Sequence, residues 1–310
     1  MMAKLQEVQD AVSKAIDKHC VDRQEPRDDM VIRCSSIGEE CERDLWYCFR
    51  WVATKKRHEG RADRIFETGH LYEERQKGYL AAIGCTVEGD QTEVVFLNGL
   101  MKGHIDGTII GVPGAEKTLH LWENKSLNDK SFEDFRHRGV EESKPIYFAQ
   151  LQIYMNGLGL ERALFMATNK NNDAIAAERV KADPLAAAAI IAKAERIAFS
   201  DSPPPKQESF ACRWCRNKGV CQDGEWPRVN CRTCLSFDVG QDGKFRCAWH
   251  GNAELSEFAA CPDHRFVPEL VPNSEQIDAD ERERLVTYRL ADGSIWIDGM
   301  HAKPDVKDTE

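Results

Sequence analysis

Apolar residues recur along this chain with two different spacings, and the spacing predicts the order of its elements. Over residues 61–82 they recur every three or four residues, as on one face of a helix, and Gly84 is a typical stop signal. Alternating apolar and polar residues then predict three strands, at 92–97, 101–110 and 119–123. A turn over 111–114 separates the last two strands, so we expect them to pair.

The second half of the chain starts with the same alternation of helix and strand and then changes character. The pattern predicts a helix at 145–158, a strand at 163–167, a further strand ending near Val180 and an alanine-rich helix at 184–199. The prolines of 202–205 then read as a linker. The last third is rich in cysteine, and a hairpin turned by Asp292-Gly293 is expected over 286–297.

The N-terminal residues 1–20 have the pattern of a polar amphipathic helix, with its apolar side formed by Leu5, Val8, Val12 and Ile16. This stretch lacks the uncharged apolar core of a signal peptide, and no apolar run of about 18 residues occurs in the chain. We therefore expect a cytoplasmic protein without a membrane partner.

Composition narrows the choice of function only in part. The 310 residues are 42% hydrophobic, which supports a folded core, and the formal net charge is −10. Such a charge counts against a generic basic nucleic-acid binder, because phosphate contacts need Lys and Arg. It is compatible with an enzyme that concentrates carboxylates to hold cations, provided that a local face is basic.

Two predicted neighbouring strands carry a candidate set of reactive residues. Asp106 lies in the strand 101–110, and Glu123 and Lys125, two residues apart on one face, lie at the end of the next strand. Two carboxylates can hold Mg²⁺ or Mn²⁺, and a lysine can orient an attacking water. The alternative is a turn aspartate beside a solvated strand face, because an E-x-K triplet alone is common.

These motifs, in this order, resemble the RecB-like branch of the PD-(D/E)XK nuclease superfamily. The branch has an acidic residue, a (D/E)-x-K motif and a Q-x-x-x-Y motif on the next helix, which Gln150 and Tyr154 match. The resemblance implies a restriction-endonuclease-like α/β core, with a mixed central sheet flanked by helices. It also implies that Gln150 and Tyr154 contact DNA or steady the site.

The same branch carries a metal-binding histidine on an early helix, and His70 occupies the matching place. By resemblance, His70 joins Asp106 and Glu123 as a metal ligand, although a lone helical histidine is more often structural or exposed. Asn124 departs from the pattern, since the family usually has an apolar residue there. This departure leaves the three ligands intact.

Seven of the twelve cysteines follow residue 211, and the first group has C-x2-C-x5-C spacing. In several RecB-like nucleases, including those of CRISPR adaptation, three such cysteines and one upstream cysteine hold a four-iron, four-sulfur cluster. The resemblance assigns that role to Cys41, Cys212, Cys215 and Cys221. Four thiolates suit zinc equally well, and Cys34 and Cys48 compete with Cys41 as the fourth ligand.

The second cysteine group has three knuckles of C-x2-(C/H) spacing within 34 residues, which is typical of structural zinc. The leading ligand set is Cys231, Cys234, Cys247 and Cys261, with His250 and His264 as substitutes. A region with so little apolar content needs metal for stability. The chain thus divides into a helical segment at 1–60, a nuclease core at 61–222 and a zinc-ribbon-like region with a terminal hairpin at 223–310.

The leading functional hypothesis is a metal-dependent DNA exonuclease of recombination or end processing, of the kind that phages encode. The chain has no Walker motif for an ATP motor, so its partners besides DNA could include a single-strand annealing protein, a helicase or a CRISPR integrase. The alternatives are a non-cleaving zinc or iron–sulfur module that binds nucleic acid, and an electron-transfer protein. Both leave Asp106, Glu123 and Lys125 without a purpose.

Overall fold

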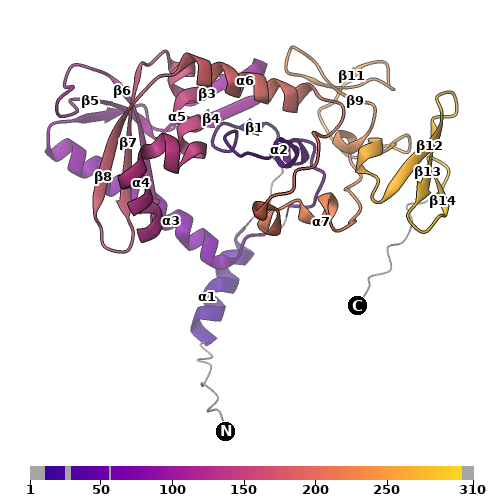
Figure 1. Ribbon diagram of the computed structural model, residues 1–310, viewed down its shortest axis with the longest axis horizontal. Helices are drawn as coiled ribbons and strands as arrows, with labels where there is room; N and C mark the ends of the chain where they lie inside the picture. The colour runs from indigo at the N-terminus through magenta and orange to yellow at the C-terminus, as the bar shows by residue number, and fades with distance from the viewer. Residues whose placement is uncertain (1–10, 25–28, 56, 302–310) are drawn as a thin grey trace, which may run out of the picture.

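A mixed five-stranded sheet forms the centre of the larger part of the molecule (Figure 1). The computed structural model describes residues 11–24, 29–55 and 57–301. The strand order is β2-β5-β6-β7-β8, in which β6 and β7 are parallel and the other neighbours antiparallel. The strands are β2 (Thr86–Glu88), β5 (Gly107–Ile110), β6 (His120–Leu127), β7 (Arg162–Asn169) and β8 (Ile175–Lys181).

Helices cover both faces of this sheet, which confirms the predicted mixed α/β architecture. Helix α3 (Gly60–Ala82) packs against β6, where Leu80 and Trp122 share a small apolar cluster. On the other face, α4 (Asp129–Ser143) and α5 (Pro145–Leu158) cover β6 and β7, and α6 (Pro184–Phe199) packs on α5. The bounds of α5 and α6 are those that the sequence predicts.

The predicted strand 101–110 is wrong in one respect, because it is two strands in two sheets. Its first half is β4 (Met101–His104), which lies between β1 (Ile32–Arg33) and β3 (Glu93–Phe96) in a three-stranded sheet. The chain bends at Ile105 and Asp106 and enters the central sheet as β5. The bend joins the two sheets and places Asp106 at their junction.

Two of the longer helices in the described part of the chain were not predicted from the sequence pattern. Helix α2 (Glu42–Phe49) buries Leu45, Trp46 and Phe49 in the main hydrophobic core, so part of the N-terminal segment belongs to the core of the protein. Helix α4 has a charged surface and is interrupted by Gly139, whose φ of 72° is left-handed. Its apolar set is small, which explains why periodicity did not show it.

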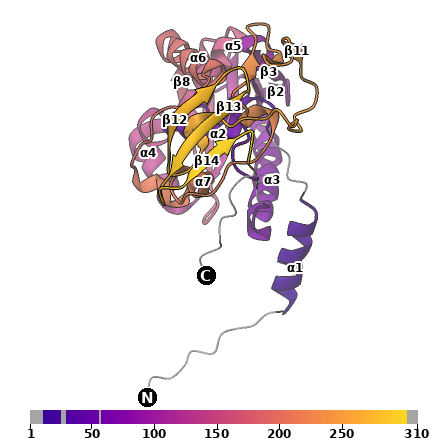
Figure 2. The ribbon, with the colours of Figure 1, turned by 90° about the vertical axis from the view of Figure 1, so that its right-hand side faces the viewer.

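The N-terminal helix α1 (Ala11–Asp22) projects from the body beside the start of α3 (Figures 1 and 2). The predicted Leu5 and Val8 lie outside the described residues, while Val12 and Ile16 are 66% and 47% exposed. The contact with α3 is close at Gly60, where a Cβ would lie 2.4 Å from the Asp17 carbonyl oxygen.

The cysteine-rich part contains two small antiparallel sheets (Figure 2). One consists of β9 (Phe237–Val239), β10 (Phe245–Cys247) and β11 (Ala253–Glu254), and the other of β12 (Ser274–Asp280), β13 (Leu285–Leu290) and β14 (Ile295–Asp298). The pairing of β13 with β14 confirms the predicted hairpin. Along the chain, the short α7 (Lys218–Cys221) follows α6 and precedes both small sheets.

A buried arginine joins the cysteine-rich part to the core. The Arg232 guanidinium is fully buried, donates to the carbonyl oxygen of Phe49 at 2.6 Å and lies 4.3 Å from the ring centre of Trp51. The two parts are therefore packed against each other through a charged group whose cost of burial is offset by hydrogen bonds and aromatic faces. Among the described residues, no helix is long and apolar enough to cross a membrane.

Candidate functional site

Backbone register brings the candidate carboxylates together. Gly107 pairs with Trp122, so one further step of the antiparallel register sets Asp106 opposite Glu123. Asp106 Oδ2 accepts a hydrogen bond of 2.8 Å from the backbone nitrogen of Asn124, which fixes the carboxylate at the edge of β6. The bend between β4 and β5 leaves Asp106 half-buried.

Glu123 is a fully buried carboxylate in strand β6 of the central sheet. It is 0% exposed, and its Oε1 accepts from Lys125 Nζ and, at 2.9 Å, from Gln150 Nε2. Its Oε2 is buried and has no hydrogen-bond partner among the described residues. Burial raises the pKa of Glu123 to about 7, the Lys125 charge opposes this, and the Asp106 charge adds to it. An unpartnered buried carboxylate oxygen is costly unless a cation or proton accompanies it.

Lys125 lies on the same face as Glu123, as two residues apart on a strand require. Its ammonium pairs with Glu123 and lies 5.4 Å from the ring centre of Tyr147, and its side chain is 23% exposed. Burial disfavours the charge, but the Glu123 and Asp106 carboxylates outweigh it and raise the pKa of Lys125. The lysine therefore stays protonated beside the two acids.

Gln150 and Tyr154 lie one turn apart on α5 and are 5% and 1% exposed. Gln150 steadies Glu123 directly, and burial raises the pKa of the Tyr154 phenol. A Cβ on Gly103 would lie 2.4 Å from the Tyr154 hydroxyl, so the tyrosine packs on the backbone of β4. These contacts support the steadying role, while neither side chain offers much surface to DNA.

Helix α3 contributes further charge to the same region. The Glu73 carboxylate adds to the forces that raise the pKa of Glu123, and it pairs with Lys77 at 2.9 Å. Lys77 also pairs with Asp90 at 2.6 Å. The predicted ligand His70 is on this helix, but its side chain is 78% exposed and stands 3.9 Å from Glu73. The role of His70 as a metal ligand stays a prediction. Glu73, whose charge acts on Glu123, is an acidic candidate on the same helix that the sequence pattern did not single out.

The first cysteine group gathers around one small cavity. Cys41, at the start of α2, and Cys212, Cys215 and Cys221 all line a space of about 20 Å³. Cys215 donates to Asp44 Oδ1 at 3.0 Å, and burial raises its pKa to about 12. The rival Cys34 lies in the main core, and Cys48 lines a different cavity. The structure thus favours Cys41 as the fourth member.

The second cysteine group surrounds a cavity of about 160 Å³, lined by Cys231, Cys234, Cys247, Cys261, His250 and His264. Burial raises the pKa of Cys231 to about 11, and the other three thiols add to this effect. His264 is engaged elsewhere, because its Nε2 lies 3.2 Å from Thr233 Oγ1. Among the described residues, the possible ligand atoms of His250, Cys261 and Asp263 lie within 4.8 Å of one another. Asp263 is a candidate that the sequence analysis did not consider.

Comparisons with known proteins find likeness of structure alone. No protein-family model matches the sequence, and no curated protein matches it. Among solved structures, SSO0001 is 15% identical, with a TM-score of 0.40 over 69% of this chain and 98% of that one.

An alkaline exonuclease from Laribacter hongkongensis is 14% identical, with a TM-score of 0.41 over 59% of this chain and 90% of that one. A phage-related exonuclease from Haemophilus somnus 129PT is also 14% identical, with a TM-score of 0.39 over 54% and 92%. Likeness at this level decides nothing about activity, so the function must be argued from the site.

Proposed function

We propose that this protein is a divalent-metal-dependent DNA nuclease that uses Asp106, Glu123 and Lys125. The observation that carries the proposal is the buried Glu123 carboxylate, which has one unpartnered oxygen next to Asp106. A fold does not leave such an oxygen uncompensated without a reason, and a bound cation supplies one. A purely structural strand face would not place a fully buried acid beside a second acid and a lysine.

The residues fit a magnesium or manganese ion by their chemistry. Carboxylate oxygens are the ligands that these hard cations prefer, and Asp106 and Glu123 would hold the metal, with His70 or Glu73 as an additional ligand. When bound, such a metal polarises the phosphodiester and lowers the pKa of a coordinated water.

The chain's own residues have separate tasks in this proposal. Lys125, kept protonated by its acidic neighbours, can donate from Nζ to the attacking water or to the charge that develops on phosphate. Gln150 holds the Glu123 carboxylate in position through its 2.9 Å hydrogen bond. Tyr154 packs on Gly103 and so supports the strand that leads to Asp106.

The finer description rests on the sequence resemblance. By that resemblance, the protein would be a RecB-like exonuclease of the PD-(D/E)XK superfamily that acts on DNA in recombination or end processing. A single-strand annealing protein, a helicase or a CRISPR integrase would be its partner. A soluble, cytoplasmic location suits this role.

The first cysteine cavity would hold a structural metal group. Cys41, Cys212, Cys215 and Cys221 are four thiols of the kind that bind either a four-iron cluster or zinc. Either group would tie α2 to the end of the core.

The second cavity would hold zinc through Cys231, Cys234, Cys247 and Cys261, with His250 beside Cys261 at 3.5 Å as the substitute. Zinc there would stabilise a region whose two sheets are short. Metal analysis of the purified protein and absorption near 400 nm would identify the occupants, since iron–sulfur clusters are brown and zinc is colourless.

The decisive experiment incubates linear DNA with the protein and Mg²⁺ or Mn²⁺. We expect degradation by the wild type, none with a chelator, and none by Asp106→Asn. Asp278→Asn, at an exposed carboxylate in β12, is the matched control and should cut normally. If the wild type binds DNA without cutting it under any of these metals, the non-cleaving binding module replaces the nuclease.

A further inference from the structure

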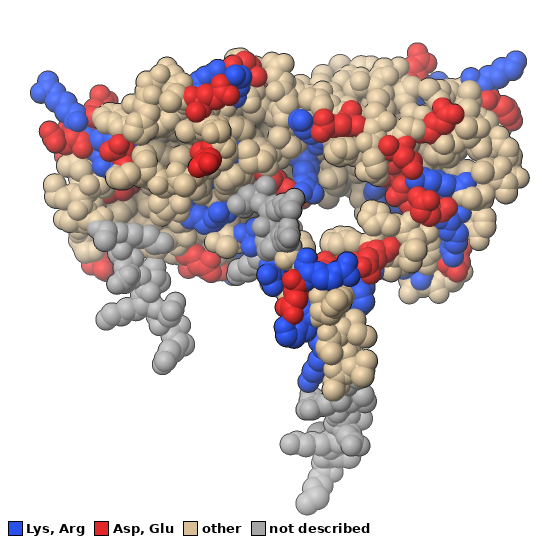
Figure 3. Space-filling model, turned by 180° about the vertical axis from the view of Figure 1, so that it is seen from behind, with Lys and Arg blue, Asp and Glu red and all other residues tan. Residues whose placement is uncertain are grey.

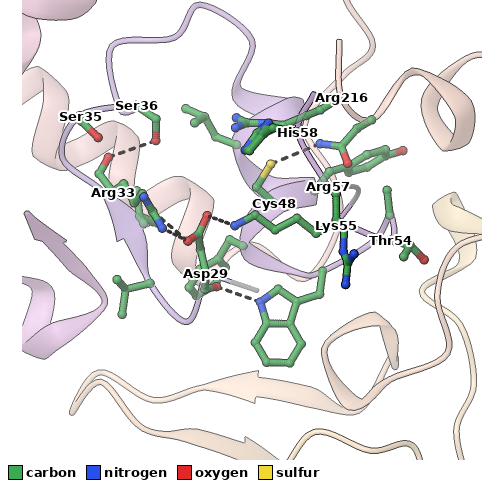
Figure 4. Close-up of a pocket in the computed structure, with 18 residues that line it drawn as sticks. Asp29, Arg33, Ser35, Ser36, Cys48, Thr54, Lys55, Arg57, His58 and Arg216 are labelled. Atoms are coloured by element: carbon green, nitrogen blue, oxygen red, sulfur yellow. Dashed lines mark hydrogen bonds and ion pairs between the residues drawn. The ribbon is translucent and has the colours of Figure 1, made fainter. Parts of the chain in front are cut away.

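A large cationic cavity lies outside the catalytic residues. It has a volume of about 500 Å³ and is formed by the segment around β1, by α2 and by residues 51, 53–55, 57 and 58 (Figure 4). Four cationic side chains line it against one carboxylate, Asp29; they are Arg33, Lys55, Arg57 and Arg216. Asp44 and Glu39 pair with Arg216 from outside the lining, so the local excess of positive charge is modest, in a protein with a net charge of −10.

The charged side chains of this cavity lie among the Asp29 carboxylate and three hydroxyl groups. Arg33 and Lys55 reach Asp29 from two sides, at 2.5 and 3.4 Å, as Figure 4 shows. Arg216 is paired with Asp44 at 2.7 Å and with Glu39 at 3.0 Å on the side of the cysteine segment. The hydroxyl groups of Ser35, Ser36 and Thr54 also line the cavity. Cations and hydroxyls together are the groups that bind phosphate oxygens.

An exposed aromatic pair lies two residues along the chain from this cavity. Phe210 and Trp214 are 68% and 71% exposed, and their ring centres are 4.8 Å apart. The Arg213 guanidinium lies 4.8 Å from the ring centre of Phe210. Large apolar rings at such exposure are unusual, and aromatic faces beside arginine are the platform on which unpaired bases stack.

The chain connects the aromatic platform of Phe210 and Trp214 to the cavity, and strand pairing connects the cavity to the segment that leads to the proposed catalytic centre. Trp214 is separated from Arg216, which lines the cavity, by Cys215 alone. At the other side, Arg33 is in register with Lys102, four residues before Asp106. The chain bends at Ile105 and Asp106, so these four residues span less than the roughly 13 Å of a fully extended segment, a distance that a few nucleotides can bridge. Figure 3 shows Lys and Arg side chains gathered at the base of α1, beside a hollow in that face.

We propose that the cavity and the platform of Phe210 and Trp214 hold a single strand of DNA whose continuation reaches the catalytic centre. This inference rests on the proposed nuclease function and names its substrate as a single strand. The backbone phosphates lie in the cationic cavity, and bases stack on the exposed rings. A duplex does not satisfy this arrangement, because its bases are already stacked on each other and a cavity of about 500 Å³ has the size of a small-molecule pocket.

The first test measures binding alone, in a chelator, so that it does not depend on cleavage. A fluorescent 15-nucleotide oligothymidylate is titrated with the wild type, Trp214→Leu and Trp214→Phe. Leucine keeps an apolar side chain but has no aromatic face, so we expect about 5- to 150-fold weaker binding, with phenylalanine close to the wild type. Tyr79→Leu, at another exposed aromatic side chain on α3, is the control and should bind normally.

The second test addresses the cavity through the salt dependence of the same binding. Arg57→Gln should weaken binding several-fold and reduce the slope against the logarithm of salt concentration by about 0.7, the value for one lost phosphate contact on a single strand. Arg289→Gln, an exposed arginine in β13, should leave the slope unchanged.

Three results would overturn the proposal while leaving the nuclease intact. One is normal oligothymidylate binding by both Trp214→Leu and Arg57→Gln in an enzyme that still cuts. Another is equal weakening for a blunt duplex of 15 base pairs, which would make the surface insensitive to strandedness. The last is displacement of the oligomer by thymidine monophosphate at equal concentration, which would make the cavity a mononucleotide site. Failure of the proposed function looks different, since then the wild type does not cut.

Discussion

The proposed catalytic centre and the cysteine cavities position their polar groups by different means. In the centre, Asp106 and Glu123 are set opposite each other by strand register, and hydrogen bonds from Asn124 and Gln150 fix their carboxylates. Around the cavities, most thiols lie on loops and short helical turns, such as Cys212 in a five-residue 3-10 helix, and Cys247 ends the three-residue strand β10. Strand pairing positions the carboxylates of the first site. A metal bound by the thiols of either cavity would instead order the segments around it.

Because of this difference, we expect metal removal to affect activity at the first site and stability at the cysteine cavities. A site placed by a sheet keeps its geometry without metal and loses only its chemistry. A site placed by loops loses the cross-link that orders those loops, so its metal is part of the folding free energy. The predictions below use this contrast, in order of decreasing effect.

The largest effect is expected from a lost thiol ligand. Cys234→Ser should destabilise the protein by about 4 kcal/mol or more and lower the melting temperature by roughly 10 °C, measured by calorimetry, with loss of bound zinc. Cys85→Ser is the control, because Cys85 lies in neither cavity and donates to the Gly111 carbonyl oxygen, as serine also can. Equal melting temperatures for Cys234→Ser and the wild type would mean that this cavity binds no structural metal.

Removing the catalytic ammonium should act on chemistry alone. Lys125→Ala is expected to lower kcat/KM for linear DNA by about 10²- to 10³-fold, because it removes the charged donor proposed to steady the attacking water or the charge on phosphate. Lys117→Ala, at an exposed lysine before β6, should retain full activity. A loss in Lys125→Ala that came entirely from weaker DNA binding would assign the lysine to the substrate rather than to the reacting water.

A methyl group on β4 should disturb the support of the centre. In Gly103→Ala the new Cβ meets the Tyr154 hydroxyl at 2.4 Å and the Cys34 Cβ at 2.8 Å, which should cost about 1–3 kcal/mol in unfolding free energy and reduce activity. Gly78→Ala is the matched control, since nothing lies within 4 Å of its Cβ and alanine favours a helix. Urea denaturation of both variants would compare them, and equal stability would contradict the tight packing.

The smallest effect concerns pH in the metal-free protein. Because burial raises the pKa of Glu123 from 4.5 to about 7, protonated Glu123 favours the folded state. That contribution is complete below pH 4.5 and is lost as the pH rises through 7. Glu123→Gln lacks the loss, so its melting temperature should exceed that of the wild type by a few degrees at pH 8 and by less at pH 5. A difference independent of pH would contradict the raised pKa.

Magnesium sharpens the same comparison. The wild type should gain melting temperature on addition of Mg²⁺ at pH 8, because the cation compensates the Glu123 charge, and Glu123→Gln should gain none. Metal addition therefore distinguishes a ligand from a buried acid that is merely tolerated.

Local pattern was sufficient for much of the fold. Helices α5 and α6 have the predicted bounds, since their capping prolines and apolar spacing are local signals. Helix α2 was missed because its eight residues are too few to show a period, and they are buried by the core around them. The break at Asp106 was missed because alternation continues through it, although the two halves pair with different strands.

The amino-acid sequence alone specifies the chemistry available to this protein: two acids and a lysine at strand spacing, and cysteines in knuckles. Those features depend on residue type and short-range spacing. Three features come from the folded arrangement instead. Glu123 is shielded from solvent, Cys41 rather than Cys34 lines the cavity of the distant cysteines, and Gln150 donates to the Glu123 carboxylate. Burial and long-range proximity arise from packing between distant segments, and no local pattern encodes them.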